Sequence, residues 1–300
     1  MQKQIKNVFQ KVIIVLLNYN NYQDTFNCLE SLKKLTYPNY EIIVVDNHST
    51  NCSLKYLKQR TDENLFVVDS GRNGGFAFGN NVGIQKAIER DADYVLLLNN
   101  DTLVTVDFLE GLLLCFYKQE NIGVSTCRIM YNDNRDKVWY AGGMIDWNNL
   151  RATHNGIDSV NYKSTGIEIV SFASGCCMMI SVECIKKVGL LPEEYFMYYE
   201  DLDYCVKVQE AGYRIGYNPK SVIYHCVSSS GGGVDSPFVI EWSNRARRKF
   251  YSKYKWYIKN NKRAFVYIKC ELRALVKIIL RKNTVNAMKA YYRSFGKKGE

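Results

Sequence analysis

Residues 12–18 read VIIVLLN, an apolar run that ends in Asn18. Two later runs have the same form: EIIVVD (Glu41–Asp46) and YVLLLN (Tyr94–Asn99). Unbroken apolar runs of this length are typical of strands buried on both faces of a parallel sheet. Because helix-spaced apolar residues lie between them, the chain is predicted to be an α/β protein with a mostly parallel, Rossmann-like sheet and helices on both faces.

Weaker patterns complete the series. A further strand is predicted over Leu65–Val68 and a later one over residues 221–224, with helices around residues 54–60 and 76–90. Asp24 is the expected N-cap of a helix that follows the first strand, because its carboxylate can accept hydrogen bonds from free backbone N–H groups.

The composition is that of a globular protein. Hydrophobic residues make up 47% of the 300 positions, charged residues 23%, and only 4 residues are Pro, which excludes disordered and collagen-like classes. The ten Cys contain no C-x-x-C pair, so we expect reduced thiols rather than disulfides or a zinc ribbon. The first apolar run is far shorter than the roughly 20 residues of a spanning helix, so we expect no membrane span and a cytoplasmic location.

Positive charge is concentrated near the C-terminus. Residues 240–300 carry 18 Lys and Arg against 3 Glu, whereas residues 1–239 carry 22 basic and 27 acidic residues. The net charge of +10 for the whole chain therefore arises from residues 240–300, called here the basic tail, which carry +15 against −5 for the rest. Three glycines at 231–233 and Pro237 precede it, so we predict an α/β domain over 1–239 and a basic helical region over 240–300.

Polar residues stand where three of the apolar runs stop. Asn18 and Asn20 follow the first run, Asp46 ends the second, and Asn100 with Asp101 follows the run at 94–99. Parallel strands bring their carboxyl ends to one edge of the sheet, where open α/β sheets bind ligands. A carboxylate there could accept hydrogen bonds from a ribose or base, or hold a divalent cation. For Asp46 taken alone, a turn-forming role is equally open.

A glycine-rich segment, NGGFAFGNNVG at residues 73–83, leads into the helix expected over 76–90. Its glycines would let the backbone approach a ligand, and the helix start offers N–H groups to an anion. The spacing fits neither G-x-G-x-x-G nor G-x-x-x-x-G-K-[ST], so a dinucleotide-dependent dehydrogenase and a P-loop kinase lose support. Close helix packing at Gly79 and Gly83 is the structural alternative.

Seven strings follow one another over about residues 12–230. They are VIIVLLNYN, VVDNHST, GRNGGFAFGNNVGI, YVLLLNNDT, SGCCMMI, EEYFMYYEDLDYCVKVQEAGYRIGYNP and VIYH. As an ordered set they resemble the family 2 glycosyltransferases, especially the rhamnosyltransferase-like branch that builds bacterial surface polysaccharides such as capsule or O-antigen. The resemblance implies a GT-A fold and an inverting enzyme that moves rhamnose or another hexose from a dTDP or UDP donor to a hydroxyl of a lipid-linked, growing polysaccharide.

The resemblance also gives roles to residues on the donor side. Asp46 matches the carboxylate that contacts the nucleobase, and Asn18 and Asn20 lie in the motif beside it. The other residues expected at the nucleotide are Arg72, Asn73, Gly74 and Asn100.

A metal site is implied at the end of the strand over 94–99. Asp101 matches the last position of the family's metal motif, commonly D-x-D, and would bind Mg²⁺ or Mn²⁺ at the donor's diphosphate. The first position of that motif is Asn99 here, and a neutral amide is a weaker ligand than a carboxylate. His225 is the second expected contact with the metal or diphosphate, although a structural role for it is equally open.

Residues 199–203 read YEDLD and open a predicted helix. Acidic residues stabilise a helix N-terminus, but crowded carboxylates also raise one another's pKa, so that one of them can accept a proton near neutral pH. The resemblance implies that Asp201 is the general base acting on the acceptor hydroxyl. Glu200 and Asp203 would then hold the acceptor or orient the loop.

Aromatic residues near Gly142 form a further candidate. Trp139, with Tyr140 and Trp147, could belong to a mobile flap that stacks on the acceptor sugar, or equally to the core around a turn. We expect His154 at the surface.

The basic tail shows helical spacing in two segments. Aromatic residues repeat over 250–257, and residues 262–281 place one apolar stripe opposite a basic face. The stripe consists of Phe265, Ile268, Leu272, Leu275, Val276 and Ile279. Three roles are open, in decreasing weight: docking of residues 245–282 on the anionic inner face of the plasma membrane, packing of the stripe on the α/β domain, and binding of nucleic acid, which we do not expect.

Two other classes of function compete with a transferase. A sugar nucleotidyltransferase would place a basic phosphate-binding signature after the first strand, where this chain reads NYNNY. A non-catalytic nucleotide-sugar-binding scaffold would keep the fold but would not need both Asp101 and Asp201.

Overall fold

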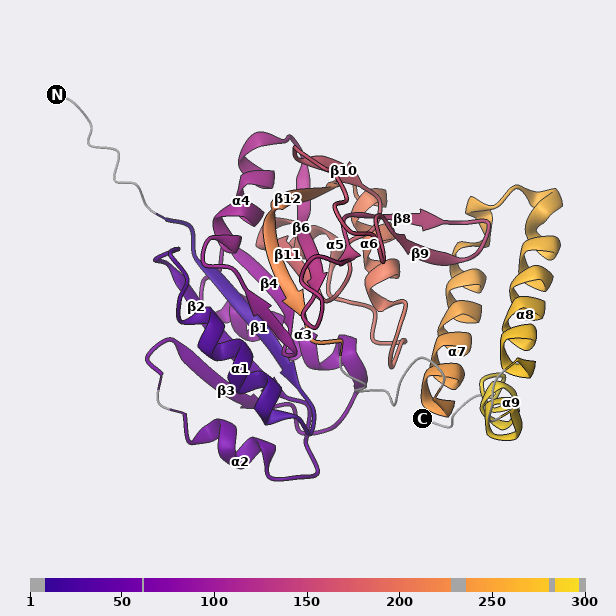
Figure 1. The fold of residues 1–300 in the computed structure, drawn as a ribbon, viewed down its shortest axis with the longest axis horizontal. Helices are drawn as coiled ribbons and strands as arrows, with labels where there is room; N and C mark the ends of the chain where they lie inside the picture. The colour runs from indigo at the N-terminus through magenta and orange to yellow at the C-terminus, as the bar shows by residue number, and fades with distance from the viewer. Residues whose placement is uncertain (1–8, 61, 228–235, 281–283, 297–300) are drawn as a thin grey trace.

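The computed structural model describes residues 9–60, 62–227, 236–280 and 284–296. A ten-stranded sheet forms the centre of these residues, with the order β10-β12-β6-β11-β4-β1-β2-β3 and with β5 and β7 paired to β12 and β6. Helices cover the sheet on both sides, and the tail helices α7, α8 and α9 stand together beyond one end of it (Figure 1).

The first half of the sheet is the predicted βαβ series. β1 pairs in parallel with both β2 and β4, and β2 pairs in parallel with β3. The elements are β1 (Val12–Asn18), α1 (Tyr22–Leu32), β2 (Tyr40–Asp46), α2 (Ser53–Lys58), β3 (Leu65–Asp69), α3 (Gly75–Glu89) and β4 (Tyr94–Asn99). The α/β prediction is confirmed, because the apolar runs fill the buried centre of the sheet.

Two details of this half bear on the predictions. The N-cap of α1 is Asn21, whose side chain accepts a hydrogen bond from the backbone N–H of Asp24. The prediction that Asp24 caps this helix was therefore wrong, because Asp24 lies inside the first turn. A Cβ atom on Gly79 would lie 2.3 Å from Leu17, and one on Gly83 would lie 2.3 Å from Val15. These two glycines let α3 pack closely on β1, as the structural alternative proposed.

The second half of the sheet adds reversed strands. Its elements are β5 (Thr102–Val104), α4 (Phe108–Lys118), β6 (Ile122–Tyr131), β7 (Val138–Tyr140), β8 (Gly143–Asp146), β9 (Arg151–His154), β10 (Glu168–Val170), β11 (Cys177–Ser181), α5 (Val182–Val188), α6 (Glu200–Glu210) and β12 (Arg214–His225). β11 is antiparallel to β4 and β6, and β12 is parallel to β6. The carboxyl ends of β1, β2, β4, β6 and β12 therefore share one edge with the start of β11.

The basic tail forms helices that pack against this domain. They are α7 (Pro237–Tyr254), α8 (Arg263–Ile279) and α9 (Thr284–Arg293), with short 3-10 turns at Lys255–Tyr257 and Asn260–Lys262. Phe250 and Tyr254 of α7 belong to the main core. The predicted boundary at 239/240 falls in the first turn of α7, and the glycines at 231–233 lie outside the described residues.

Trp147, in the turn of the β8–β9 hairpin, holds the tail in place. Its ring stacks on Tyr257 at 4.4 Å between centroids and on Phe250 at 5.6 Å. Tyr140 is fully buried. We expected these aromatic residues either in a mobile flap or in the core around a turn. Tyr140 and Trp147 fit the second expectation.

The apolar stripe of α8 faces away from the domain. Phe265, Ile268, Leu272, Val276 and Ile279 are each more than half exposed, and Leu275 packs against other residues of the tail. Of the three roles left open for this stripe, packing on the α/β domain therefore does not fit. The helix instead buries a narrower face made of Val266, Cys270 and Ile278. Within the described ranges, no helix is both long and apolar enough to span a bilayer.

Candidate active site

Asp46, at the end of β2, is a buried carboxylate with three hydrogen-bond donors. Its Oδ1 accepts from the backbone N–H of Ser49 at 2.8 Å, and its Oδ2 accepts from Ser49 Oγ and from Asn18 Nδ2, both at 2.7 Å. The side chain has no exposed surface. In this conformation Asp46 fixes the loop that follows β2, and its direct contact with a nucleobase stays a prediction.

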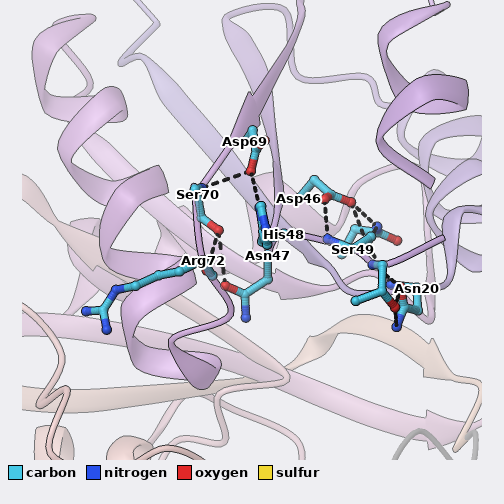
Figure 2. A network of polar contacts seen from close by, with 11 residues as sticks. Asn20, Asp46, Asn47, His48, Ser49, Asp69, Ser70 and Arg72 are labelled. Carbon is cyan, nitrogen blue, oxygen red and sulfur yellow. Dashed lines mark hydrogen bonds and ion pairs between the residues drawn. The ribbon is translucent and has the colours of Figure 1, made fainter. Parts of the chain in front are cut away.

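Asn20 joins the loops after β1 and β2 (Figure 2). Its backbone N–H donates to Ser49 Oγ at 2.8 Å, and its Oδ1 accepts from the backbone N–H of Thr50 at 2.8 Å. Asn20 has a φ of +58°, a conformation that Asn adopts more readily than most side chains. The two strand ends are thereby held as one polar surface.

A hydrogen-bonded chain continues from β1 to the end of β4. Thr25 Oγ1 donates to Asn18 Oδ1 at 3.0 Å, and Asn100 Nδ2 donates to Thr25 Oγ1 at 2.9 Å. Through Asn18 this chain also reaches Asp46. The structure thus brings together the three strand ends that were predicted to meet.

Asn47 connects β2 to the glycine-rich segment. Its Nδ2 donates to Asn73 Oδ1 at 3.0 Å and to the Gly75 carbonyl at 3.2 Å. Gly75 has a φ of +89°, and a Cβ atom there would lie 2.0 Å from the Phe196 carbonyl oxygen. Gly75 therefore serves a close approach of backbone to backbone, which positions the start of α3.

Arg72 and Gly74 flank this contact. The guanidinium of Arg72 lies 4.3 Å from the ring centroid of Phe78, and the side chain extends away from the polar network in Figure 2. Arg72 and Asn73 are both exposed, so they can meet a ligand. A Cβ atom on Gly74 would lie 2.3 Å from Phe78, which makes this glycine part of the packing under Arg72.

Asp101 and His225 form the candidate metal centre. His225 Nε2 lies 3.1 Å from Asp101 Oδ1, and each residue is only 8% exposed. Asp101 follows β4 and His225 ends β12, so two separate strand ends supply the pair. Among the residues that the structure describes, no group of three His, Cys, Asp or Glu could hold a metal.

Trp139 packs beside this centre. Its ring lies 4.8 Å from that of His225 and 4.6 Å from that of His154. Burial lowers the pKa of His154, which also contacts Tyr140 and Phe172. His154 is therefore only partly exposed, because it packs within an aromatic cluster, whereas we expected a surface residue.

The turn before α6 holds an unusual backbone. Tyr198 and Tyr199 have φ values of +71° and +72°, a conformation that costs of order 1 kcal/mol or more for each non-glycine residue. The Tyr199 hydroxyl donates to the Leu150 carbonyl at 2.6 Å. This strained turn directs the next two residues, Glu200 and Asp201, inward at the start of the helix.

Asp201 and Glu200 have different surroundings. Asp201 Oδ2 accepts from the backbone N–H of Gly175 at 3.0 Å and Oδ1 from that of Leu202 at 2.7 Å. Burial raises the pKa of Asp201, and these two backbone donors oppose the rise. Burial, together with the charge of Asp201, raises the pKa of Glu200 well above its usual range, and Glu200 Oε2 has no hydrogen-bond partner. The arrangement favours a neutral Glu200 next to an ionised Asp201.

The loop before β11 brings Asp101 and Asp201 to one place. The backbone N–H of Asn99 donates to the Cys176 carbonyl at 2.9 Å, and the adjacent Gly175 donates to Asp201. After burial, the charges of Asp101 and Asp201 are both causes of the raised pKa of the Cys176 thiol. This loop therefore contacts Asp201 directly and the end of β4, two residues before Asp101.

Comparison with known proteins shows the family to which the chain belongs. The family model described as Glycosyl transferase family 2 matches residues 12–189. The chain belongs to glycosyltransferase family 2.

Two curated relatives of this glycosyltransferase are sugar transferases by their names. The low-salt glycan biosynthesis hexosyltransferase Agl10 of Haloferax volcanii is 26% identical over 68% of this chain and 63% of its own length. The dTDP-rhamnosyl transferase RfbF of Shigella flexneri is 27% identical over 72% of this chain and 69% of its own. The chain thus spans about two thirds of these relatives.

Solved structures confirm the GT-A fold of the glycosyltransferase. The mannosyltransferase PcManGT from Pyrobaculum calidifontis, in complex with GDP-Man and Mn²⁺, superposes with a TM-score of 0.59 at 15% identity and covers 95% of this chain and 74% of its own. A crystal structure of GalNAc-T7 with UDP, GalNAc and Mn²⁺ superposes with a TM-score of 0.64 at 18% identity over 83% of this chain and 49% of its own.

Asp203 lies on the far side of α6 from the glycosyltransferase site residues just described. It has no exposed surface, and its carboxylate accepts from the Tyr195 hydroxyl at 2.9 Å, the Tyr254 hydroxyl at 2.8 Å and Lys253 Nζ at 2.8 Å. Asp203 was expected either to hold the acceptor or to orient the loop. Its contacts fit the second role, because they leave no exposed surface that could hold an acceptor.

Several site residues were missed by the sequence reasoning. Ser49 and Asn47 lie within the string VVDNHST, and Gly175 within SGCCMMI, so their strings were found but not their roles. Thr25 carried no signal, because a threonine in a helix has many ordinary uses.

Proposed function

We propose that this family 2 glycosyltransferase transfers a hexose, with inversion, from a nucleoside-diphosphate sugar to a hydroxyl of a lipid-linked surface glycan. The observation that carries the proposal is the loop at Gly175 and Cys176, which contacts Asp201 directly and also contacts Asn99, two residues before Asp101. One carboxylate is available for a cation at the donor's diphosphate, and the other for the proton of the acceptor.

The donor is proposed to be a dTDP or UDP sugar such as dTDP-rhamnose. The loops fixed by Asp46, Ser49 and Asn20 form the nucleotide side of the site. Exposed Arg72 and Asn73 stand at the rim of the same surface. In support, RfbF is named a dTDP-rhamnosyl transferase, and GalNAc-T7 was solved with UDP.

Mg²⁺ or Mn²⁺ is proposed to bind at Asp101 and His225. The two side chains offer one carboxylate and one imidazole within 3.1 Å of each other, and His225 Nδ1 is buried without a hydrogen-bond partner. Such a donor set suits a cation whose remaining ligands come from the donor's phosphate oxygens. When bound, the cation would offset the charge on the departing diphosphate.

Asp201 is proposed to accept the proton of the acceptor hydroxyl. Its two backbone donors hold the carboxylate in one orientation, while burial keeps its pKa above that of an exposed Asp. A neutral Glu200 could donate a hydrogen bond to a sugar without repelling the attacking oxygen. Direct displacement at the anomeric carbon would invert its configuration and needs no covalent intermediate.

The enzyme is proposed to work at the cytoplasmic face of the plasma membrane. The exposed apolar stripe of α8 lies within a basic tail, and this combination attracts a helix to an anionic bilayer surface. Trp139, beside His225, is proposed to line the acceptor side of the site.

Nucleotide-dependent thermal stabilisation tests the proposal. We expect UDP or dTDP to raise the melting temperature more with Mn²⁺ than without it, and Asp101→Asn to remove most of the metal-dependent part. No stabilisation by any nucleotide with metal would contradict the proposal. Release of diphosphate from a nucleoside triphosphate and a sugar phosphate would favour the nucleotidyltransferase, and binding without transfer to any acceptor would favour the scaffold.

A further inference from the structure

A second cavity lies where the basic tail meets the α/β domain. It has a volume of about 720 Å³ and is lined by the β8–β9 hairpin, the N-cap of α6, and the helices α7 and α8. Of the residues described above for the candidate active site, only Tyr199 lines it. The cavity is therefore separate from the strand-end site, although the turn before Asp201 forms part of its wall.

Three arginines line this cavity, and none of its described lining residues is Asp or Glu. They are Arg151, Arg247 and Arg273. The partner of Arg273 is neutral, because its Nη1 donates to Asn149 Oδ1 at 3.3 Å. The guanidinium of Arg273 thus brings a positive charge that this contact does not balance.

Carboxylates outside the lining balance only part of the charge. Glu271 contacts Arg247 at 2.9 Å but also contacts Arg248 at 2.7 Å, so one carboxylate serves two guanidinium groups. Asp146 lies at the longer distance of 3.7 Å from Arg151. Guanidinium groups match the oxygens of phosphates and carboxylates in particular. The cavity therefore favours a ligand that carries one of these oxyanions.

A buried amide is an independent sign of a ligand. Asn244 of α7 lines the cavity and is 6% exposed. Its Nδ2 donates to the Ile240 carbonyl at 2.7 Å, whereas its Oδ1 has no hydrogen-bond partner. A buried acceptor without a donor is costly. A ligand with hydroxyl groups would supply that donor.

The lining favours a sugar over a nucleotide. Tyr199 is the one aromatic residue among the described residues of the lining, and its hydroxyl already donates to the Leu150 carbonyl. Nucleobases are commonly held by stacking on aromatic side chains, and this cavity offers little such surface. A sugar that carries a phosphate or a carboxylate combines the oxyanion with the hydroxyl groups.

We infer that this cavity binds an anionic sugar. The phosphate or carboxylate of the sugar contacts Arg151 and Arg273, and one of its hydroxyls donates to Asn244. The inference goes beyond the proposed function, because neither the donor nor the proposed base occupies this cavity. A bound sugar would contact α7, α8 and Tyr199 together, and so would hold the tail against the turn before Asp201.

Binding of glucose 1-phosphate and of glucuronate to the full chain, measured by isothermal titration, tests the inference. We expect at least one of them to bind about tenfold or more tightly than both glucose and inorganic phosphate, because each of these lacks one half of the recognised ligand. Tighter binding of glucose 1-phosphate would assign the oxyanion as a phosphate, and tighter binding of glucuronate would assign it as a carboxylate. Saturating UDP with Mn²⁺ should displace neither sugar.

Two variants examine the two halves of the site. Arg151→Gln combined with Arg273→Gln should weaken binding of the anionic sugar by about tenfold or more. The matched control is Arg214→Gln, which removes an exposed arginine of β12 outside the cavity and should leave binding unchanged. Asn244→Leu should weaken binding of the anionic sugar by about threefold to tenfold and leave that of inorganic phosphate unchanged.

Four outcomes would overturn the inference. The first is that neither anionic sugar binds more tightly than glucose and inorganic phosphate. The second is displacement of the sugar by UDP with Mn²⁺, which would place it in the nucleotide site. The third is equal weakening by the double arginine variant and its control. The fourth is unchanged sugar binding in Asn244→Leu.

Discussion

The buried carboxylate of Asp203 and the half-buried ammonium of Lys253 form an ion pair that fastens α7 of the tail to α6. Lys253 Nζ lies 2.8 Å from Asp203 Oδ2, and two tyrosine hydroxyls complete the environment of the carboxylate. Because Asp203 follows Asp201 by two residues, the first helix of the tail is attached to the helix that carries the proposed base. The tail is thus part of the framework of the active site.

Removing Asp203 should destabilise the protein more than removing Lys253. Asp203→Ala leaves two buried hydroxyls without their acceptor, whereas Lys253 keeps its ion pair with Glu194. We expect a loss of about 1–3 kcal/mol in the free energy of unfolding for each hydroxyl. Lys253→Met should cost less, because both tyrosine hydroxyls still donate to Asp203. Urea denaturation of the two variants measures the difference, and equal losses would count against this description of the pair.

Glu200→Gln should change how stability depends on pH. The pKa of Glu200 is raised in the folded state. The folding stability that Glu200 contributes is therefore fully present below the pKa that its carboxyl has in the unfolded chain. This stability is lost as pH rises toward the pKa of Glu200 in the folded protein. The Gln variant lacks this loss. Its melting temperature should therefore exceed that of the wild type increasingly from pH 5 to pH 8, and a constant difference across this range would contradict the raised pKa.

The pH at which activity falls on acidification should depend on the pKa of Asp201. Its pKa is raised by burial, so kcat/KM should fall on acidification at a pH above the roughly 3.9 of an exposed Asp. In Glu200→Gln this acid limb should persist, because Asp201 is the proposed proton acceptor. Disappearance of the limb in that variant would assign the proton acceptor to Glu200 instead.

Ser49→Ala should weaken nucleotide binding. The hydroxyl donates to Asp46 and accepts from the backbone of Asn20, and a hydrogen bond to a charged group is worth roughly 1.5–3 kcal/mol. We expect nucleotide affinity to fall by about tenfold with a smaller loss of global stability. Isothermal titration with UDP or dTDP checks this, and unchanged affinity would show that the loop does not serve the nucleotide.

The sheet and the strand-end site were predictable because local sequence determines them. Each apolar run is long enough to be a buried strand, and parallel strands must bring Asn18, Asp46 and Asn100 to one edge. The hydrogen-bond partners were not predictable to the same degree. Asn21 and Asp24 both suit an N-cap, and only the backbone path decides between them.

The arrangement of the tail depends on contacts distant in sequence. Trp147 packs between Phe250 and Tyr257, and Asp203 binds Lys253, across separations that no periodicity reveals. The stripe on α8 was found correctly as a pattern, but a pattern does not say what covers it. In the structure the helix buries a narrow opposite face made of Val266, Cys270 and Ile278 and leaves most of the stripe exposed.

The central claim is that Asp201 acts on the acceptor at a site where the donor is already bound. The most direct measurement is sugar transfer and nucleotide-sugar binding by Asp201→Asn on one preparation, beside Glu200→Gln as the matched neighbouring variant. We predict that Asp201→Asn lowers kcat by about 10²–10⁴-fold with donor affinity nearly unchanged, whereas Glu200→Gln keeps most activity. Loss of donor binding together with transfer, or full activity of Asp201→Asn, would contradict the account.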